Sequence, residues 1–110
     1  MNDAVEVEAS SGNVFADIGV AEPEVVLAKA ELARRIDQII RARRLKQVAV
    51  AKILGVDQAK VSALVRGRLA GFSAERLFRF LNALGHDIEI VVKQKPRSRK
   101  RAHVTVVSSG

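Results

Sequence analysis

The stretch QVAVAKILGVDQAKVSALVRG, residues 47–67, decides the fold of this chain. Its pattern predicts two short helices joined by a tight turn, and Gly55 tolerates the positive φ that such a turn requires. A helix-turn-helix crosses its helices at a steep angle, so the first helix needs a small residue at the crossing, and Ala51 is one. The second helix needs apolar residues on its inner face. The residues predicted to hold the two helices together are Ala51, Gly55, Val56, Val61 and Leu64.

Two interpretations of this stretch are open. One is a helix-turn-helix, and the other is a generic helical hairpin that stops at a glycine. Each feature alone also fits the hairpin. The joint spacing of the small residue, the glycine and the inward apolar positions favours the helix-turn-helix, and neither helix contains a proline.

A helix-turn-helix lays its second helix, here residues 58–66, in the major groove of DNA with its first residues at the base edges. Gln58 can pair with adenine, and Ser62 can donate or accept a hydrogen bond at several bases. The methyl groups of Ala59 and Ala63 can touch the methyl group of thymine. The alternative for Gln58 is an ordinary exposed residue of a helix.

Other polar residues near the motif are expected to contact phosphates, which fix the register on DNA without reading its sequence. Gln47, at the start of the first helix, is placed to reach a phosphate and to brace Gln58. Phe72 is expected to pin the loop after the second helix to the core. The complete set of predicted DNA-binding residues is Gln47, Gln58, Ala59, Lys60, Ser62, Ala63, Arg66 and Arg68.

Hydrophobic periodicity predicts a mainly helical fold around the motif. Besides the two short helices at 46–54 and 58–66, it predicts a long helix at 24–43 and another at 74–84. The apolar stripes of these two helices are Leu32, Ile36, Ile39 and Ile40 in the first, and Leu77, Phe78, Leu81 and Leu84 in the second.

Residues 86–93 alternate instead, with Ile88, Ile90 and Val92 on one face, and a period of two predicts a β-strand. A lone strand leaves backbone groups unpaired, so it needs a partner. The partner is either the same strand in a second copy, which would make the strand a dimerisation element, or the segment near residues 14–15. The expected organisation is a flexible acidic N-terminus (1–12), one domain (13–93) and a flexible basic tail (94–110).

The charge is unevenly distributed along the chain, whose formal net charge is +7. Residues 1–31 contain seven acidic residues and one basic residue, whereas residues 32–110 contain 18 basic and five acidic residues. So basic a domain is expected to attract polyanions, nucleic acid first among them. A well-solvated surface explains the charge alone equally well, and the same two explanations apply to the basic tail.

Composition argues against other classes of function. The chain has no cysteine and only two histidines, His86 and His103, neither of them beside a carboxylate cluster. We therefore expect no enzyme, no metal site and no cofactor. There is no apolar run of the roughly 18–20 residues that a membrane span needs, nor a signal-peptide pattern. The expectation is a soluble protein of the bacterial cytoplasm, associated with the nucleoid.

Four stretches carry a resemblance to a known family: the motif itself, SGNVFADIG (11–19), LAKAELARRI (27–36) and GFSAERLFRFLNALGHDIEI (71–90). Over residues 11–97 the chain resembles the XRE-type helix-turn-helix regulators, which include phage lambda repressor and Cro. It resembles more closely a subgroup similar to HigA antitoxins.

The resemblance implies a lambda-repressor-like bundle of four to five helices and a dimeric repressor that binds a palindromic operator in its own operon. It also implies a partner, a small RelE- or HigB-like toxin that the protein neutralises. In one place the chain departs from the pattern: many relatives have Thr or Ser before the glutamine that opens the motif, and this chain has Lys46.

Overall fold

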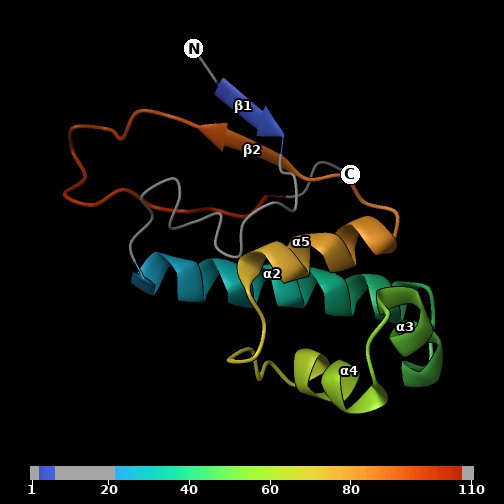
Figure 1. The fold of residues 1–110 in the computed structure, drawn as a ribbon. Helices are drawn as coiled ribbons and strands as arrows, with labels where there is room; N and C mark the ends of the chain where they lie inside the picture. Colours follow the sequence, from blue (N-terminus) through green and yellow to red (C-terminus); the bar gives the residue numbers. More distant parts are fainter. Residues whose placement is uncertain (1–2, 7–21, 108–110) are drawn as a thin grey trace.

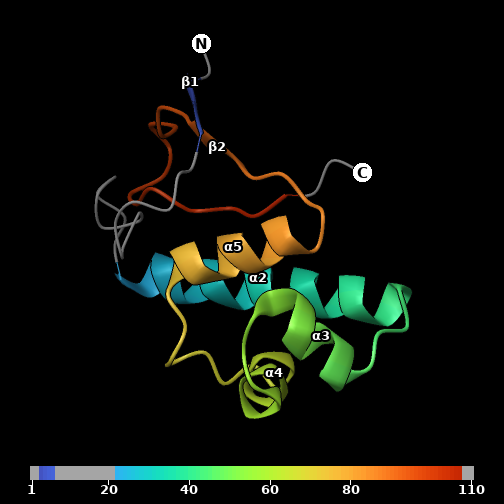
Figure 2. The ribbon, with the colours of Figure 1, turned by 45° about the vertical axis from the view of Figure 1, so that its right-hand side comes forward.

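The computed structural model describes residues 3–6 and 22–107, and these form three layers (Figure 1). The middle layer holds helices α2 (Glu22–Ala42) and α5 (Ala74–Ala83). Helices α3 (Gln47–Leu54) and α4 (Gln58–Val65) lie below it, and strands β1 (Asp3–Glu6) and β2 (Glu89–Val92) lie above it. Figure 2 shows the same separation from a second direction. The predicted mainly helical fold with a C-terminal strand is confirmed.

Helix α2 begins with Glu22, Pro23 and Glu24, which suit a first turn because proline lacks an N–H there and acidic residues complement the helix dipole. Its predicted apolar stripe is buried and packs against α5. The opposite face carries ion pairs between neighbouring turns, Arg34 with Glu31 and Arg41 with Asp37, both at 2.9 Å. The hydrogen bond that Arg34 donates to Glu31, together with the negative charge of Glu31, raises the pKa of Arg34.

Helix α5 is capped by Ser73, whose hydroxyl accepts a hydrogen bond from the backbone N–H of Arg76 at 3.1 Å. Its four predicted core residues are buried, and Phe80 and Glu75 are buried beside them, which the pattern did not predict. The Glu75 Oε1 atom accepts a hydrogen bond from Arg79 at 2.9 Å. Within the described part of the chain its Oε2 atom is buried without a partner.

The ends of α2 and α5 are joined by a single side chain. Arg43, just after α2, donates a hydrogen bond of 2.6 Å to the carbonyl oxygen of Leu84, where α5 ends. Gly85 follows with φ +88°, and the His86 N–H donates to the Leu81 carbonyl oxygen at 2.9 Å. This closure satisfies the last carbonyl groups of α5 and turns the chain toward β2.

Strand β2 pairs antiparallel with β1 in the register Asp3–Val92 to Glu6–Glu89. Within this single chain the partner of β2 is thus β1. Of the two partners expected, the segment near residues 14–15 lies outside the described residues, and pairing with a second copy stays a prediction. Residues 3–6, which belong to the segment expected to be flexible, form β1. The physical reason is the one that predicted a partner: an exposed strand edge is stabilised by any extended segment that supplies backbone donors and acceptors.

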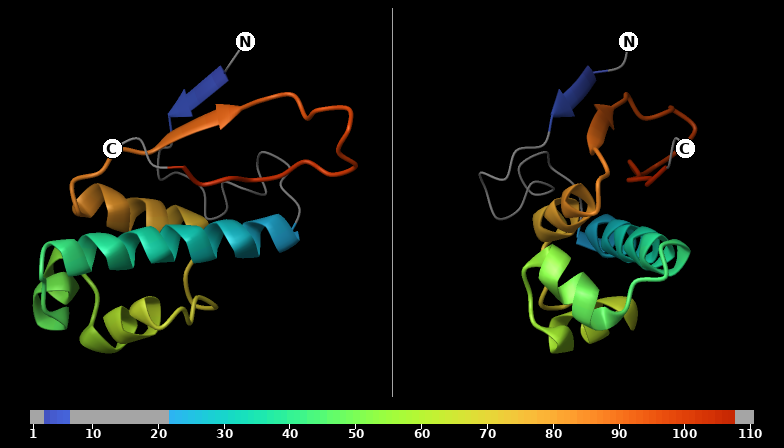
Figure 3. Two further views of the ribbon diagram at one scale, coloured as in Figure 1. Left: turned by 180° about the vertical axis from the view of Figure 1, so that it is seen from behind. Right: turned by 90° about the vertical axis from the view of Figure 1, so that its right-hand side faces the viewer.

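The C-terminal stretch also departs from the expectation of a flexible tail. After a turn in which the Arg99 N–H donates to the Pro96 carbonyl oxygen, the chain runs back between β2 and the helices (Figures 1 and 3). Val104 and Val106 are half-buried and pack against the core, while Thr105 between them is exposed. The two valines lie on one face of an extended segment and bury apolar surface there, which holds the C-terminal stretch against the core.

Candidate nucleic-acid interface

The turn between α3 and α4 has the geometry that the sequence predicts. Gly55 adopts φ +69° and ψ 34°, the left-handed region, and the Val56 N–H donates to the Ala51 carbonyl oxygen at 3.0 Å. A β-carbon on Gly55 would meet nothing within 4 Å. The glycine is therefore required by its backbone conformation and not by lack of space.

The inner faces of the two helices form a continuous part of the core. Val61 of α4 has no exposed surface, Leu64 is 2% exposed, and Val50 of α3 has no exposed surface. Ala51 and Val56 are half-buried and pack against this cluster. Of the five residues predicted to hold the motif, Val61 and Leu64 are thus buried in the core, Ala51 and Val56 pack against it, and Gly55 forms the turn.

Helix α4 is held at its start by Asp57, whose side chain accepts a hydrogen bond from the backbone N–H of Lys60 at 2.8 Å. Helix α3 has no such cap, because Lys46 occupies the N-cap position and makes no side-chain hydrogen bond there. The residue at which the chain departs from the pattern of its relatives therefore leaves α3 without a side-chain cap. The free N–H groups of the first turn of α3, together with the ammonium of Lys46, make its start favourable for an anion.

The outward face of α4 carries polar and small side chains. Gln58, Ala59 and Arg66 are exposed and Ser62 is half-buried. Within residues 22–107 the side chains of Gln58, Ser62 and Arg66 make no hydrogen bond. Ala63 differs from the prediction in part, because it is half-buried and packs against the core. Gln47 and Arg68, at the two ends of the motif, are exposed.

Lys60 is engaged by an aromatic ring. Its ammonium lies 5.6 Å from the centre of the Phe72 ring, and the Arg76 guanidinium lies 5.7 Å from the same ring and 5.6 Å from that of Phe80. Phe72 and Phe80 meet edge to face at 5.9 Å. Phe72 is 4% exposed, so the expectation that it pins the loop after α4 to the core is confirmed.

This aromatic–cation cluster (Lys60, Phe72, Arg76 and Phe80) was not predicted as a unit. Cation–π contacts stabilise by roughly 0.5–1 kcal/mol each at exposed sites. The cluster therefore ties α4 to the start of α5 and restricts the angle at which α4 is presented. The signal that could have found it is the spacing of Phe72, Arg76 and Phe80, which repeats every four residues and so follows one face of a helix.

The charge of the motif is nearly all positive. Residues 43–72 contain seven basic residues and one acidic residue, Asp57, whose carboxylate caps α4. Of these seven, the basic side chains without an ion pair, hydrogen bond or cation–π contact to the described residues are Arg44, Lys46, Lys52, Arg66 and Arg68. A surface with several uncompensated cations around an exposed helix raises the local concentration of a polyanion.

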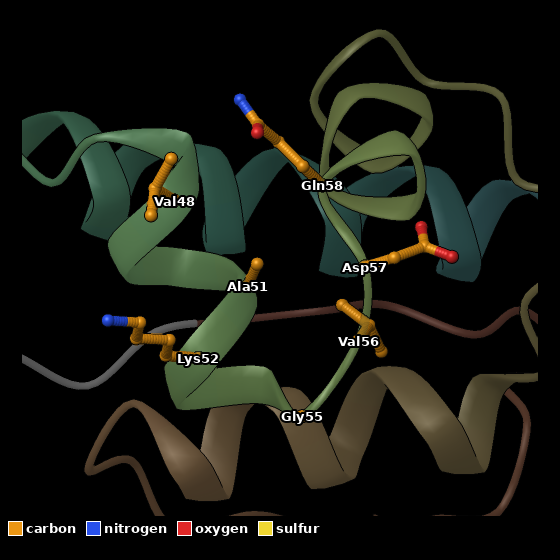
Figure 4. A pocket seen from close by; sticks show the side chains of 7 residues that line it. All are labelled: Val48, Ala51, Lys52, Gly55, Val56, Asp57 and Gln58. Atoms are coloured by element: carbon orange, nitrogen blue, oxygen red, sulfur yellow. The ribbon is translucent and has the colours of Figure 1, made fainter.

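A shallow, open hollow of about 390 Å³ separates α3 from the start of α4 (Figure 4). The side chains of Val48, Ala51 and Lys52 line one wall, and Gln58 extends outward at the other (Figure 4). The hollow is the groove between the two crossing helices. Within the described residues no group of three or more metal-ligating side chains occurs, and none of the described helices is long and apolar enough to cross a membrane.

Comparison with known proteins agrees with this geometry. Residues 14–93 match the family model described as a helix-turn-helix domain. One solved structure, designated a candidate XRE family transcriptional regulator, is 46% identical in sequence, with a TM-score of 0.76, over 81% of this chain and 100% of that one. No curated protein matches the chain. The family binds DNA and is not enzymatic, in accord with the prediction from composition. The chain belongs to the XRE family of helix-turn-helix transcriptional regulators.

Proposed function

We propose that this regulator is a sequence-specific autorepressor that binds a palindromic operator as a dimer. The observation that carries the proposal is the outward face of α4, where Gln58 and Ser62 are free of hydrogen bonds to the described residues on a helix fixed by a cap and an aromatic–cation cluster. A rigid helix with unengaged polar side chains loses little entropy when those side chains bind base edges.

The residues of the interface divide into two roles. Gln58 pairs with an adenine, Ser62 hydrogen-bonds a neighbouring base, and the exposed methyl group of Ala59 contacts a thymine methyl. Arg66 and Arg68 contact phosphates on one side, and Gln47 with the start of α3 contacts a phosphate on the other. Lys60 and Ala63 contribute less than their positions in the sequence suggest, because both are partly engaged within the protein.

Dimerisation follows from the weakness of this recognition surface. One glutamine, one serine and a methyl group discriminate few base pairs, at about 1–3 kcal/mol for each good pairing. A second copy related by a two-fold axis doubles the contacts. It also places the second recognition helix about 34 Å away, one turn of DNA along the same face.

The test is binding of the purified protein to the DNA upstream of its own gene, measured by fluorescence anisotropy at rising salt. The expected affinity for the true site exceeds that for a scrambled duplex of equal length by a factor of about a thousand or more. The logarithm of the binding constant should fall linearly with the logarithm of the salt concentration. Equal displacement by the scrambled duplex would refute sequence-specific repression.

A second candidate function is neutralisation of a small basic toxin, with DNA binding as autoregulation. The observation that favours it is at the start of α2, where Val26 and Leu27 are 58% and 60% exposed beside the acidic residues Glu22 and Glu24. Apolar side chains ringed by acidic ones fit a basic partner.

The experiment for this candidate begins with the reading frames beside the gene, where a small basic protein of about a hundred residues is expected. The double variant Val26→Asp/Leu27→Asp should lose binding to that protein and retain binding to the operator. Lys100→Glu/Arg101→Glu, which changes charge far from α2 in the sequence, is the control. Full binding of the neighbouring protein by the first variant would show that α2 is not the contact.

A further inference from the structure

We infer that β2 is a self-complementary strand that pairs antiparallel with β2 of a second copy, with Val91 opposite Val91. The inference rests on the dimer of the proposed function and names the surface, the register and the segment that competes for it. It follows from three observations: the two faces of β2, the order of charges along it, and the strand that covers its outer edge.

The two faces of β2 differ in burial. Ile88 and Ile90 are half-buried and pack against the core, whereas Asp87, Glu89 and Val91 are exposed. Val92, on the same face as Ile90, is 49% exposed, so this face leaves the core at the end of the strand. Strand β2 itself spans Glu89–Val92; the inferred pairing extends it to residues 87–95, whose odd-numbered residues then share one face. These residues read Asp87, Glu89, Val91, Lys93 and Lys95: two acids, one apolar residue, then two bases.

This order becomes complementary when the strand meets itself in the antiparallel direction. With Val91 on the two-fold axis, Glu89 of each copy lies opposite Lys93 of the other. Asp87 then lies opposite Lys95, so one strand pair holds four acid–base pairs. For this pairing the Lys95 ammonium leaves the carbonyl oxygens of Pro96 and Arg99, to which it donates in the monomer. Opposite charges directly across an antiparallel ladder are stabilising, and like charges are destabilising.

The alternative registers satisfy burial and charge together less well. A slip of one residue would put the apolar face of one strand on the solvent face of the pair. A slip of two residues pairs Val91 with Glu89 or with Lys93 and loses the central apolar contact. The register centred on Val91 therefore satisfies both burial and charge.

The second copy competes with β1 for β2. From the outside inward the order is β1, β2, the returning C-terminal stretch and then the helices (Figures 1 and 3), so β1 covers the edge that faces away from the body. The β1 pairing spans four residues, Asp3–Glu6 with Glu89–Val92. A second β2 offers a longer ladder with opposite charges. Asp3–Glu6 is thus an intramolecular cover that protects the edge in the monomer and is displaced on dimerisation.

The decisive experiment uses two full-length charge-swap proteins in sedimentation equilibrium. Asp87→Lys/Glu89→Lys places lysine opposite lysine in its homodimer, and Lys93→Glu/Lys95→Glu places acid opposite acid. Each alone should dimerise at least about tenfold more weakly than the wild type, because four attractive cross-strand pairs become repulsive. Mixed one to one, they form a heterodimer in which all four pairs are again opposite, and association should return.

The control is Lys100→Glu/Arg101→Glu, which makes the same change in net charge as Lys93→Glu/Lys95→Glu but outside the strand, and it should leave association unchanged. Restored association in the mixture supports the register. Homodimers as tight as the wild type, or a mixture no tighter than its components, would overturn it. If the wild type binds its operator specifically but as a monomer, the pairing fails while sequence-specific recognition stands. If the wild type does not bind its operator specifically, the proposed function itself is refuted.

The cover is tested by the variant Ala4→Pro/Val5→Pro. Neighbouring residues of a strand direct their N–H groups to opposite sides, so one of the two prolines removes a donor to β2. We expect at least a severalfold lower dissociation constant for the dimer. A higher dissociation constant would show that β1 belongs to the dimer interface. An unchanged dissociation constant would show that β1 does not compete with the second copy for the edge of β2.

Discussion

The two helical layers of the molecule use their polar side chains in opposite ways. On the layer of α2 and α5, basic residues are engaged within the protein, Arg34 and Arg41 in ion pairs and Arg43 on the end of α5. On the layer of α3 and α4, Arg66 and Arg68 are exposed and make no such contact with the described residues. The first layer holds the fold together, whereas the second presents groups whose partners lie outside the chain.

The difference extends to the helix starts. Ser73 caps α5 and Asp57 caps α4, whereas α3 begins at Lys46 without a side-chain cap. An uncapped start costs stability, and here it leaves amide groups and a cation available for a phosphate. In this fold, the polar groups without partners in the described chain coincide with the proposed DNA-binding surface. Variants of each layer should therefore separate stability from recognition.

The largest effect is expected in the helical layer that stabilises the fold. Leu77 has no exposed surface and lies between α5 and α2, so Leu77→Ala should lower the free energy of unfolding by about 2–5 kcal/mol in urea titrations. Val107→Ala, at a position 83% exposed, is the control and should change little. A loss below about 1 kcal/mol for Leu77→Ala would mean that the core between α2 and α5 repacks freely.

The next largest effect is expected on the recognition layer, where stability should not change. Gln58→Ala should weaken binding to the operator by about 1–3 kcal/mol and relax the preference at one base pair. Arg68→Ala should weaken binding to all sequences alike and reduce the salt slope by about one. Equal losses on operator and random DNA for Gln58→Ala would assign Gln58 to a phosphate contact.

A smaller effect is expected at Asp57, the cap of α4, because this residue affects both stability and DNA binding. Asp57→Ala should cost about 1 kcal/mol of stability by removing the bond to the Lys60 N–H. Asp57→Ser keeps a capping oxygen and removes the one negative charge of residues 43–72. It should therefore retain stability in thermal unfolding and bind DNA more tightly. Weaker DNA binding by Asp57→Ser would show that the carboxylate orients α4 in a way a hydroxyl cannot.

The parts of the structure that sequence could predict are those fixed by neighbours within a few residues. Gly55 and Gly85 mark helix ends, Asp57 and Ser73 mark helix starts, and the stripes of α2 and α5 follow from helical spacing. Each of these depends on the local backbone, so the periodicity alone predicts it. The element bounds observed differ from those expected by a few residues at most.

The parts that sequence could not predict depend on residues far apart in the chain. The register of Glu6 with Glu89 and the cation–π contact of Lys60 with Phe72 arise only once the layers have packed. Burial of Val104 and Val106 likewise requires a core that their own segment does not define. In the candidate site, the positions of Gln58 and Ser62 were predictable from helical spacing, whereas the internal engagement of Lys60 was not.

The smallest and most discriminating effect is expected at Lys46. Lys46→Ser supplies the missing cap of α3, so the free energy of unfolding should rise by about 0.5–1 kcal/mol. The same change removes a cation beside the free amide groups of the first turn, so operator binding should weaken and the salt slope should fall by about one. Lys52→Ser, in the last turn of α3, is the matched control: it removes the same charge without supplying a cap.

If Lys46→Ser, and not Lys52→Ser, raised the stability and lowered the affinity for the operator, the uncapped start of α3 would be shown to favour binding at a cost in stability. If Lys46→Ser raised both the stability and the affinity for the operator, the phosphate would not bind at the start of α3. The difference between the two layers would then lie only in the outward face of α4.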